Sequence, residues 1–142
     1  MLSDTHISNN ILKGLMFVGA NASGKSNAIL AVKFLLDSLL GKNDINFASY
    51  HCLFSPDPAT KLKYIFSIDN TDVQYEITYQ TIDEYIQEKL FVDNVLLFER
   101  NGSFAKVNIN EETTHSDVPN KTLFLRDIYF NTKFRGNSVL QK

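Results

Sequence analysis

The sequence predicts an α/β protein in which a strand, a glycine-containing loop and a helix precede an antiparallel β-meander. The loop, residues 19–26, stands between a short apolar run and an apolar segment of helical length. After it, residues 45–109 are rich in β-branched and aromatic residues, with Asp, Asn and Gly clusters between the runs. At 142 residues, the chain is long enough for one ordinary domain.

The first predicted element is a short strand before the loop. Residues 14–18 read Gly-Leu-Met-Phe-Val, an apolar run typical of a parallel strand that is covered on both faces. We expect it to lead directly into the loop.

Residues 19–26 read Gly-Ala-Asn-Ala-Ser-Gly-Lys-Ser and match the phosphate-loop pattern G-x-x-x-x-G-K-[ST] at every fixed position. Gly19 and Gly24 can adopt dihedral angles closed to other residues, so successive N–H groups can point inward at phosphate oxygens. The start of the following helix also favours an anion. We expect Lys25 to contact the β- and γ-phosphates and the Ser26 hydroxyl to ligate Mg²⁺. The alternative, a glycine turn opening an ordinary helix, needs all these features to coincide by accident.

The sequence therefore predicts a nucleotide site for ATP with Mg²⁺, Ser26 being the metal ligand. It predicts no catalytic residue. The nucleotide-binding set is Gly19, Ala20, Asn21, Ala22, Ser23, Gly24, Lys25, Ser26 and Asn27.

Residues 26–40 read as a helix, with Gly41 placed as a C-cap glycine. Apolar residues cover most of its surface and leave a narrow polar stripe through Lys33 and Asp37. We expect a core helix with a sheet on one side and further protein on the other.

The β-region predicts a meander of up to five strands. Residues 61–69 and 73–81 form a hairpin around Asp-Asn-Thr-Asp. Asp93-Asn94 and Asn101-Gly102 separate the later strands, which we place at 85–92, 95–100 and 104–109. Residues 82–90 also fit helical spacing.

The last region begins with a polar stretch, residues 110–120, which we expect to be a mobile loop. Apolar residues within 123–130 have the spacing of a short amphipathic helix. The predicted organisation is one incomplete lobe, 1–142, with a strand, loop and helix at 12–41, the β-subdomain at 45–109 and the start of a helical region at 121–142.

Composition narrows the classes of protein. The chain is 44% hydrophobic and 21% charged, with a net charge of −2, so no overall basic field indicates nucleic acid. It has no run of eighteen apolar residues and no signal-peptide pattern at its start, so we expect a cytoplasmic protein without a membrane partner. Its single cysteine, Cys52, excludes an internal disulfide framework.

Other candidates for chemistry are weak. Asp69 ends an apolar strand, as a magnesium-binding aspartate does, but its Asp-Asn-Thr-Asp context favours a turn. His51 and Cys52 would face opposite ways in a strand, and no other residue supplies metal-ligand spacing. The isolated residues His6, His115, Arg100, Arg126 and Arg135 are interpreted as surface residues.

The loop with Asn at its third place and Ser-Gly-Lys-Ser-Asn at its end resembles the AAA-15/AAA-21 type of ATPase, a relative of OLD nucleases and of the ABC-like heads of SMC proteins. Tyr75-Glu76-Ile77, Glu88-Lys89-Leu90 and Leu97-Phe98-Glu99-Arg100 resemble the β-subdomain of such heads, and Leu123-Phe124-Leu125 resembles the segment leading into their helical arm. The resemblance covers most of the chain.

The resemblance implies ATP binding between two facing heads, with hydrolysis completed by elements far down the chain. The sequence lacks a Leu-Ser-x-Gly segment, an apolar strand ending in Asp-Glu and a switch histidine. We therefore expect the ATP-binding N-terminal portion of a longer ATPase, inactive alone, a possible homodimer that meets nucleic acid only through regions outside the chain. The alternatives are a small-molecule kinase, for which no arginine-rich lid is visible, and a non-catalytic interaction module.

Overall fold

The computed structural model describes residues 7–8, 11–12, 16–21, 24–40, 46–51, 57–80, 85–109, 111–115 and 117–130. Their secondary structure begins with two short antiparallel strands, β1 (Ile7–Ser8) and β2 (Ile11–Leu12). Helix α1 (Lys25–Leu40) follows, and then a 3₁₀ turn, η2 (Phe47–Tyr50). The predicted helix is confirmed to within one residue at its start.

Among the described residues, a six-stranded antiparallel sheet and one further helix, α2 (Phe124–Phe130), complete the fold. Its strands follow one another in chain order: β3 (Ala59–Ile68), β4 (Thr71–Gln80), β5 (Tyr85–Val92), β6 (Val95–Asn101), β7 (Phe104–Ile109) and β8 (Glu111–His115). The mixed α/β class and the meander are therefore confirmed. The helical alternative for 82–90 is wrong, since residues from Tyr85 pair with β4.

Two expectations about the elements need correction. Residues 16–19 form no strand and are exposed, because no described strand lies beside them to accept their backbone hydrogen bonds. Residues 111–115, expected in a mobile loop, pair with β7 as a sixth strand.

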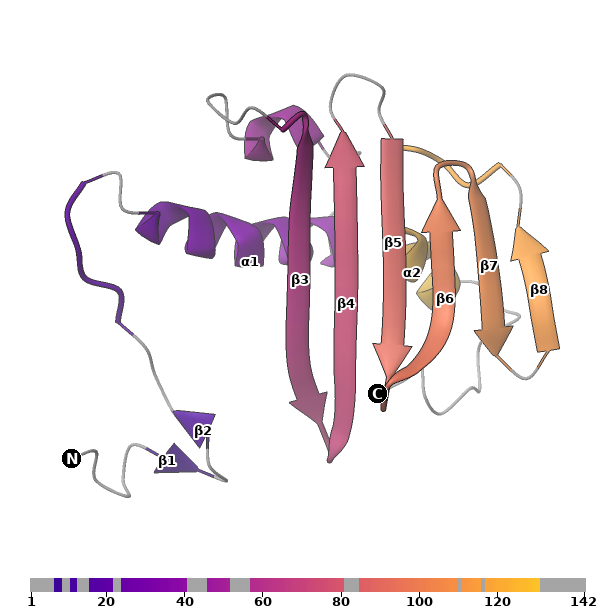
Figure 1. Ribbon diagram of the computed structural model, residues 1–142, viewed down its shortest axis with the longest axis horizontal. Helices are drawn as coiled ribbons and strands as arrows, with labels where there is room; N and C mark the ends of the chain where they lie inside the picture. The colour runs from indigo at the N-terminus through magenta and orange to yellow at the C-terminus, as the bar shows by residue number, and fades with distance from the viewer. Residues whose placement is uncertain are drawn as a thin grey trace.

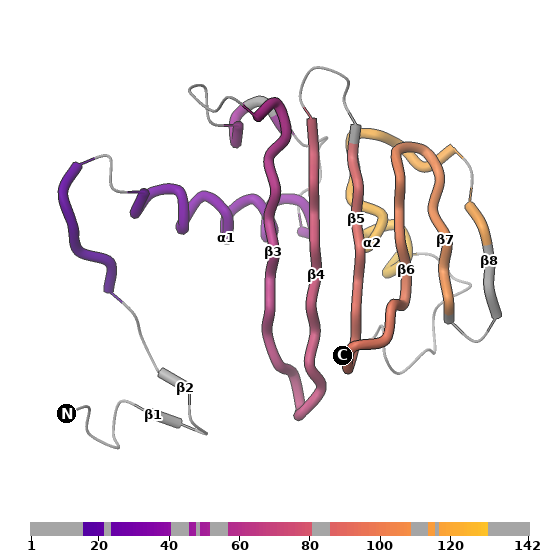
Figure 2. The backbone as a smooth tube through the Cα atoms, viewed as in Figure 1, coloured from indigo at the N-terminus to yellow at the C-terminus, as the bar shows by residue number. Residues whose placement is uncertain are grey.

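Both helices lie on one face of the sheet, α1 over β3 and β4 and α2 over β5 and β6 (Figure 1). The tube in Figure 2 shows α1 crossing the strands, with its first turns extending beyond the edge of the sheet. The core lies between the sheet and the helices. Its buried apolar side chains are Phe34, Tyr75, Ile77, Tyr79, Ile86, Leu90, Phe98, Ala105, Val107, Val118, Leu123, Phe124 and Ile128.

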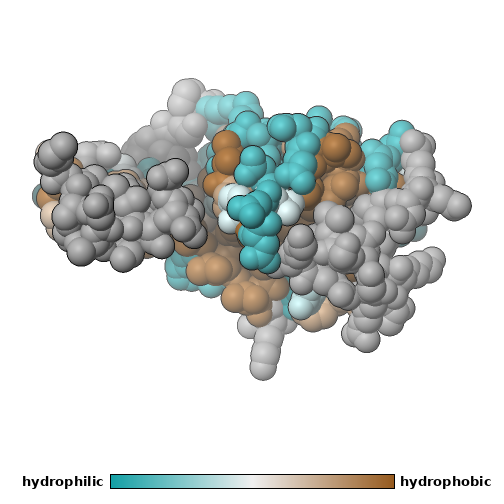
Figure 3. All heavy atoms as spheres, turned by 90° about the horizontal axis from the view of Figure 1, so that it is seen from below, coloured by the Kyte–Doolittle hydropathy of each residue, from teal (hydrophilic) through white to brown (hydrophobic). Residues whose placement is uncertain are grey.

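Helix α1 buries only one stripe of its surface. Phe34 and Ser38 are buried against the sheet side, whereas Ile29, Val32 and Leu36 are each more than half exposed. Nothing among the described residues packs on the second face, so the further protein expected there stays a prediction. Figure 3 shows apolar side chains beside hydrophilic ones on the molecular surface.

Candidate functional site

The phosphate-loop sequence leads directly into α1. Gly24 has φ of +85°, a left-handed conformation that favours glycine, and a Cβ at this position would meet nothing within 4 Å. Its carbonyl oxygen accepts hydrogen bonds from the N–H groups of Asn27 at 3.0 Å and Ala28 at 3.3 Å. Gly24 thus turns the chain into the first helical turn.

The Lys25 side chain folds back over the loop. Its ammonium donates to the carbonyl oxygens of Gly19 at 2.8 Å and Ala20 at 2.5 Å. The two ends of the loop are therefore tied together by the residue expected to contact phosphate. Lys25 is half-buried, and Ser26 and Asn27 beside it are exposed.

The start of α1 suits an anion. Its first turn contains no acidic residue, and the positive end of the helix dipole lies there. Of the nine predicted residues, Gly19, Ala20, Asn21, Gly24, Lys25, Ser26 and Asn27 are described and lie at or beside this helix start; Ala22 and Ser23 lie outside the described residues.

The other residues considered for metal binding do not lie together in the structure. Asp69 has φ of 48° and lies in the β3–β4 turn, which confirms the turn interpretation. The His51 ring shares a hydrogen bond of 3.0 Å with the Thr60 hydroxyl, and Cys52 lies outside the described residues. Within the described segments, no three His, Cys, Asp or Glu side chains are grouped to hold a metal ion.

Three residues interpreted as surface residues are not fully solvated. Arg100 is 1% exposed. His115 is half-buried with its ring 5.5 Å from that of Phe124, and the half-buried Arg126 places its guanidinium over the Phe130 ring at 5.8 Å. His6 and Arg135 lie outside the described residues.

A buried polar network, which sequence reasoning missed, surrounds the Arg100 guanidinium. It donates to the Glu88 carboxylate at 2.8 Å and to the carbonyls of Gly102, Pro119 and Thr122, each at 2.7 Å. The alternation of side chains along a strand could have indicated that Glu88 is buried, because it lies between the inward-facing Ile86 and Leu90.

Glu88 in turn holds the start of α2. Its carboxylate accepts from the Phe124 N–H at 2.8 and 3.0 Å and from the Tyr75 hydroxyl at 2.5 Å. Burial raises the pKa of Glu88, while Arg100 and these donors oppose that rise. Burial, together with the Glu88 charge, raises the pKa of Tyr75 well above its ordinary value.

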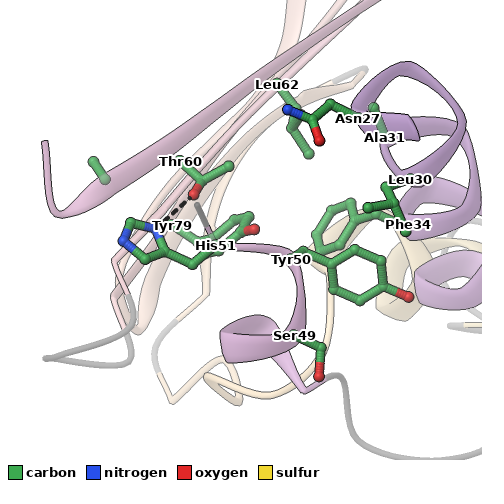
Figure 4. Close-up of a pocket in the computed structure, with 11 residues that line it drawn as sticks. Asn27, Leu30, Ala31, Phe34, Ser49, Tyr50, His51, Thr60, Leu62 and Tyr79 are labelled. Atoms are coloured by element: carbon green, nitrogen blue, oxygen red, sulfur yellow. Dashed lines mark hydrogen bonds between the residues drawn. The ribbon is translucent and has the colours of Figure 1, made fainter. Parts of the chain in front are cut away.

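A cavity of about 310 Å³ lies between α1, η2 and the first residues of β3 (Figure 4). It begins at Asn27, the last residue of the predicted nucleotide-binding set, and reaches Phe34, about two helical turns further along α1. Figure 4 shows aromatic rings of Tyr50, Phe34 and Tyr79 gathered around it.

A family model described as AAA domain, putative AbiEii toxin, Type IV TA system, matches residues 15–128. The matched range contains the phosphate-loop sequence, the whole six-stranded sheet and most of α2. The chain belongs to this AAA family. The resemblance to an AAA-type ATPase is thereby confirmed. No curated protein and no solved structure matches the chain.

Membership of the AAA family identifies the chain as a nucleotide-binding, ATPase-like module. In this AAA domain, no helix of the described segments is long and apolar enough to cross a membrane. The AAA domain thus consists of the loop before α1, the helix itself, and a sheet in which Glu88 and Arg100 form a buried ion pair.

Proposed function

We propose that this AAA domain binds ATP with Mg²⁺ through residues 19–27, as the N-terminal nucleotide-binding lobe of an ABC-like ATPase head. The position of the Lys25 ammonium, between two loop carbonyls at the start of α1, carries the proposal. Lys25 would exchange these neutral acceptors for phosphate oxygens, because an ammonium is attracted more strongly to a negatively charged oxygen than to a neutral carbonyl oxygen.

The remaining residues of the loop would contact the phosphates and Mg²⁺. The backbone N–H groups from Gly19 to Gly24 would surround the phosphates, and the Ser26 hydroxyl would complete a Mg²⁺ shell that also contains phosphate oxygens. Asn27 would contact the phosphate nearest the ribose. The absence of an acidic side chain in the first turn of α1 supports this arrangement, since a carboxylate there would repel the ligand.

Hydrolysis would need more than these residues. The sequence contains no Leu-Ser-x-Gly segment and no apolar strand ending in Asp-Glu, so we propose that ATP is held without turnover until a further half of the head and a facing copy complete the site. A phosphate-release assay on the chain alone checks this part. Sustained turnover would refute it.

Calorimetric titration of MgATP into the chain tests the binding. We expect Lys25→Ala to weaken binding at least tenfold, and Ser26→Ala to remove the benefit of adding Mg²⁺. Lys33→Ala is the matched control, because Lys33 lies two turns along the same helix and pairs with Asp37. Absent heat with the wild type, or equal heat with Lys25→Ala, would sink the proposal.

A non-catalytic interaction module is the second candidate function. The exposed apolar face of α1, with Ile29 64% and Val32 56% exposed, favours it. The two candidates differ in whether association depends on nucleotide.

A further inference from the structure

The two edges of the six-stranded sheet differ in length and in charge. Among the described residues, β3 forms one edge and pairs only with β4, and β8 forms the other. β8 is five residues long and begins with two acidic residues. β3 is ten residues long, contains no proline and pairs with β4 without a bulge. Long, regular edges are open to pairing with a further strand, whereas short, charged edges resist it.

The free edge of β3 presents backbone donors and acceptors at alternate residues. The two-residue turn before β4 has positive φ angles, so its flanking residues, Ile68 and Thr71, form a hydrogen-bonded pair. Because bonded and non-bonded pairs alternate along an antiparallel ladder, the odd-numbered residues of β3 direct their N–H and C=O groups away from β4. The Ala59 N–H agrees with this assignment, since it donates to the Asp57 carboxylate at 2.9 Å. Ile65, which is 70% exposed, is one of these outward residues.

The side chains along this edge define the chemistry of a matching strand. On the face of the sheet away from the helices, Lys61 and Lys63 are exposed, and β3 contains no acidic residue. On the face toward α1, Phe66 follows Leu62 and Tyr64 by alternation and is 40% exposed. Carboxylates opposite the two lysines and an apolar side chain opposite Phe66 would therefore stabilise an added strand.

Both lysines already take part in one ion pair, and both stay accessible. The Lys61 ammonium lies 3.3 Å from the Asp57 carboxylate, and the Lys63 ammonium lies 3.2 Å from the Glu76 carboxylate on β4. The two lysine side chains are 69% and 51% exposed. An ammonium has three donors, so each lysine can bind a second carboxylate from the open side. Glu76 lies directly opposite Lys63 in the ladder, and an added strand would repeat this pairing.

Helix α1 would cover the added strand on one face. Its first turns extend beyond the β3 edge in Figure 2, on the side of the sheet where both helices lie. The Leu30 side chain shares a helical face with the buried Phe34 and is 41% exposed. An apolar side chain on the added strand would therefore meet apolar surface above it as well as beside it.

We propose that the free edge of β3 binds an extended peptide of another protein. The peptide runs antiparallel to β3, with carboxylates opposite Lys61 and Lys63 and apolar residues at the alternate positions that face α1. In strand addition of this kind, main-chain hydrogen bonds supply the affinity and alternate side chains the selectivity. The proposal does not involve residues 19–27, so it goes beyond the proposed function and does not depend on bound nucleotide.

A fluorescently labelled peptide with the β4 sequence, residues 71–80, is the probe, because β3 already pairs with this sequence on its other side. We expect its anisotropy to rise to saturation as the full chain is added. A matched peptide carrying Glu76→Lys should bind at least threefold more weakly, because like charges would then stand opposite Lys63.

Two variants of the chain test the two kinds of contact. Ile65→Pro removes an outward N–H without removing a hydrogen bond to β4, and edge strands tolerate proline at such positions. It should weaken peptide binding at least tenfold, whereas Ile65→Val, the matched control, keeps the N–H and should bind as the wild type does. Lys63→Glu should reverse the preference, so that the Glu76→Lys peptide binds more tightly than the unchanged one.

The proposal fails if the wild-type chain does not bind the β4 peptide. Equal binding by Ile65→Pro and Ile65→Val, or a Lys63→Glu variant that keeps the wild-type preference, would also overturn it. Circular dichroism checks that Ile65→Pro keeps its sheet; if it does not, the reversed preference of Lys63→Glu decides. Self-association of the wild type that is lost in Ile65→Pro would assign the edge to a second copy and overturn the peptide. None of these outcomes bears on the binding of MgATP.

Discussion

The Arg100 guanidinium donates to the Glu88 carboxylate at 2.8 Å between two neighbouring strands, and both side chains are fully buried. Their network joins β5 and β6 to the segment before α2, through the carbonyls of Pro119 and Thr122. The Phe124 N–H also donates to the Glu88 carboxylate, and these hydrogen bonds fix one packing of α2 on the sheet. The pair therefore ties α2 to the meander.

Removing one partner should be costly. We expect Arg100→Leu to lower the free energy of unfolding by about 3–5 kcal/mol, because the Glu88 carboxylate would stay buried without its counter-charge. Denaturant unfolding followed by circular dichroism measures it. Glu99→Gln is the control: Glu99 neighbours Arg100 but pairs with Lys89 on the open face at 3.7 Å, and such exposed pairs contribute about 0–1 kcal/mol. Similar losses in the two variants would contradict the assigned role of Arg100.

The second prediction concerns the contribution of the tight β5–β6 turn to stability. Asp93 and Asn94 join β5 to β6 with φ of 48° and 64°, the positive angles of a type I′ turn. Asn94→Ala should destabilise the fold by about 1 kcal/mol, because a left-handed conformation is unfavourable for alanine, whereas Asn94→Gly should cost nothing. Unfolding midpoints of the two variants, compared with the wild type, check this ordering. A lower midpoint for the glycine variant than for the alanine variant would contradict it.

The meander could be predicted from sequence because its cues are local. Asp-Asn clusters between β-branched runs mark two-residue turns, and the structure places positive φ angles at Asp69, Asn70, Asp93 and Asn94. Strand β8 was missed, since Glu111–His115 is polar and gains its order from pairing with β7. A polar edge strand has little signal in its own sequence.

The phosphate-loop pattern is also local, since it lies within eight consecutive residues; that these residues bind phosphate stays a prediction. The cavity beside it could not be predicted. Its walls come from α1, η2 and two strands, and Tyr79 is separated from Asn27 by about fifty positions in sequence. The packing of Phe34 on Tyr79, Tyr50 and Phe47 helps to bring these walls together. Arg100 was misjudged in the same way, since its partners lie beyond its own strand.

Alkaline pH should destabilise the fold through Tyr64, a half-buried tyrosine between α1 and the sheet. Burial raises the pKa of Tyr64 to about 12, from an ordinary value of 10. The protonated phenol is thus favoured by folding, so its contribution to stability is complete below about pH 10 and is lost as the pH rises through about 12. We expect the unfolding midpoint to fall over this interval. Tyr64→Phe should make the fall shallower, although it removes the bond to the Ala31 carbonyl at neutral pH; parallel profiles would contradict the assignment.

The second candidate function, an interaction module, predicts that the exposed apolar face of α1 drives association without nucleotide. Ile29, Val32 and Leu36 are each exposed by more than 50%, and contiguous apolar surface of this kind drives contacts between molecules. We expect light scattering to show a mass that rises with concentration, and Ile29→Lys with Leu36→Glu to return the chain to a monomer. Little stability should be lost, since neither side chain is buried in the core. A monomeric wild type that pairs only with MgATP would instead favour two facing heads over the interaction module. That result would also place the contact at the phosphate loop rather than along the helix.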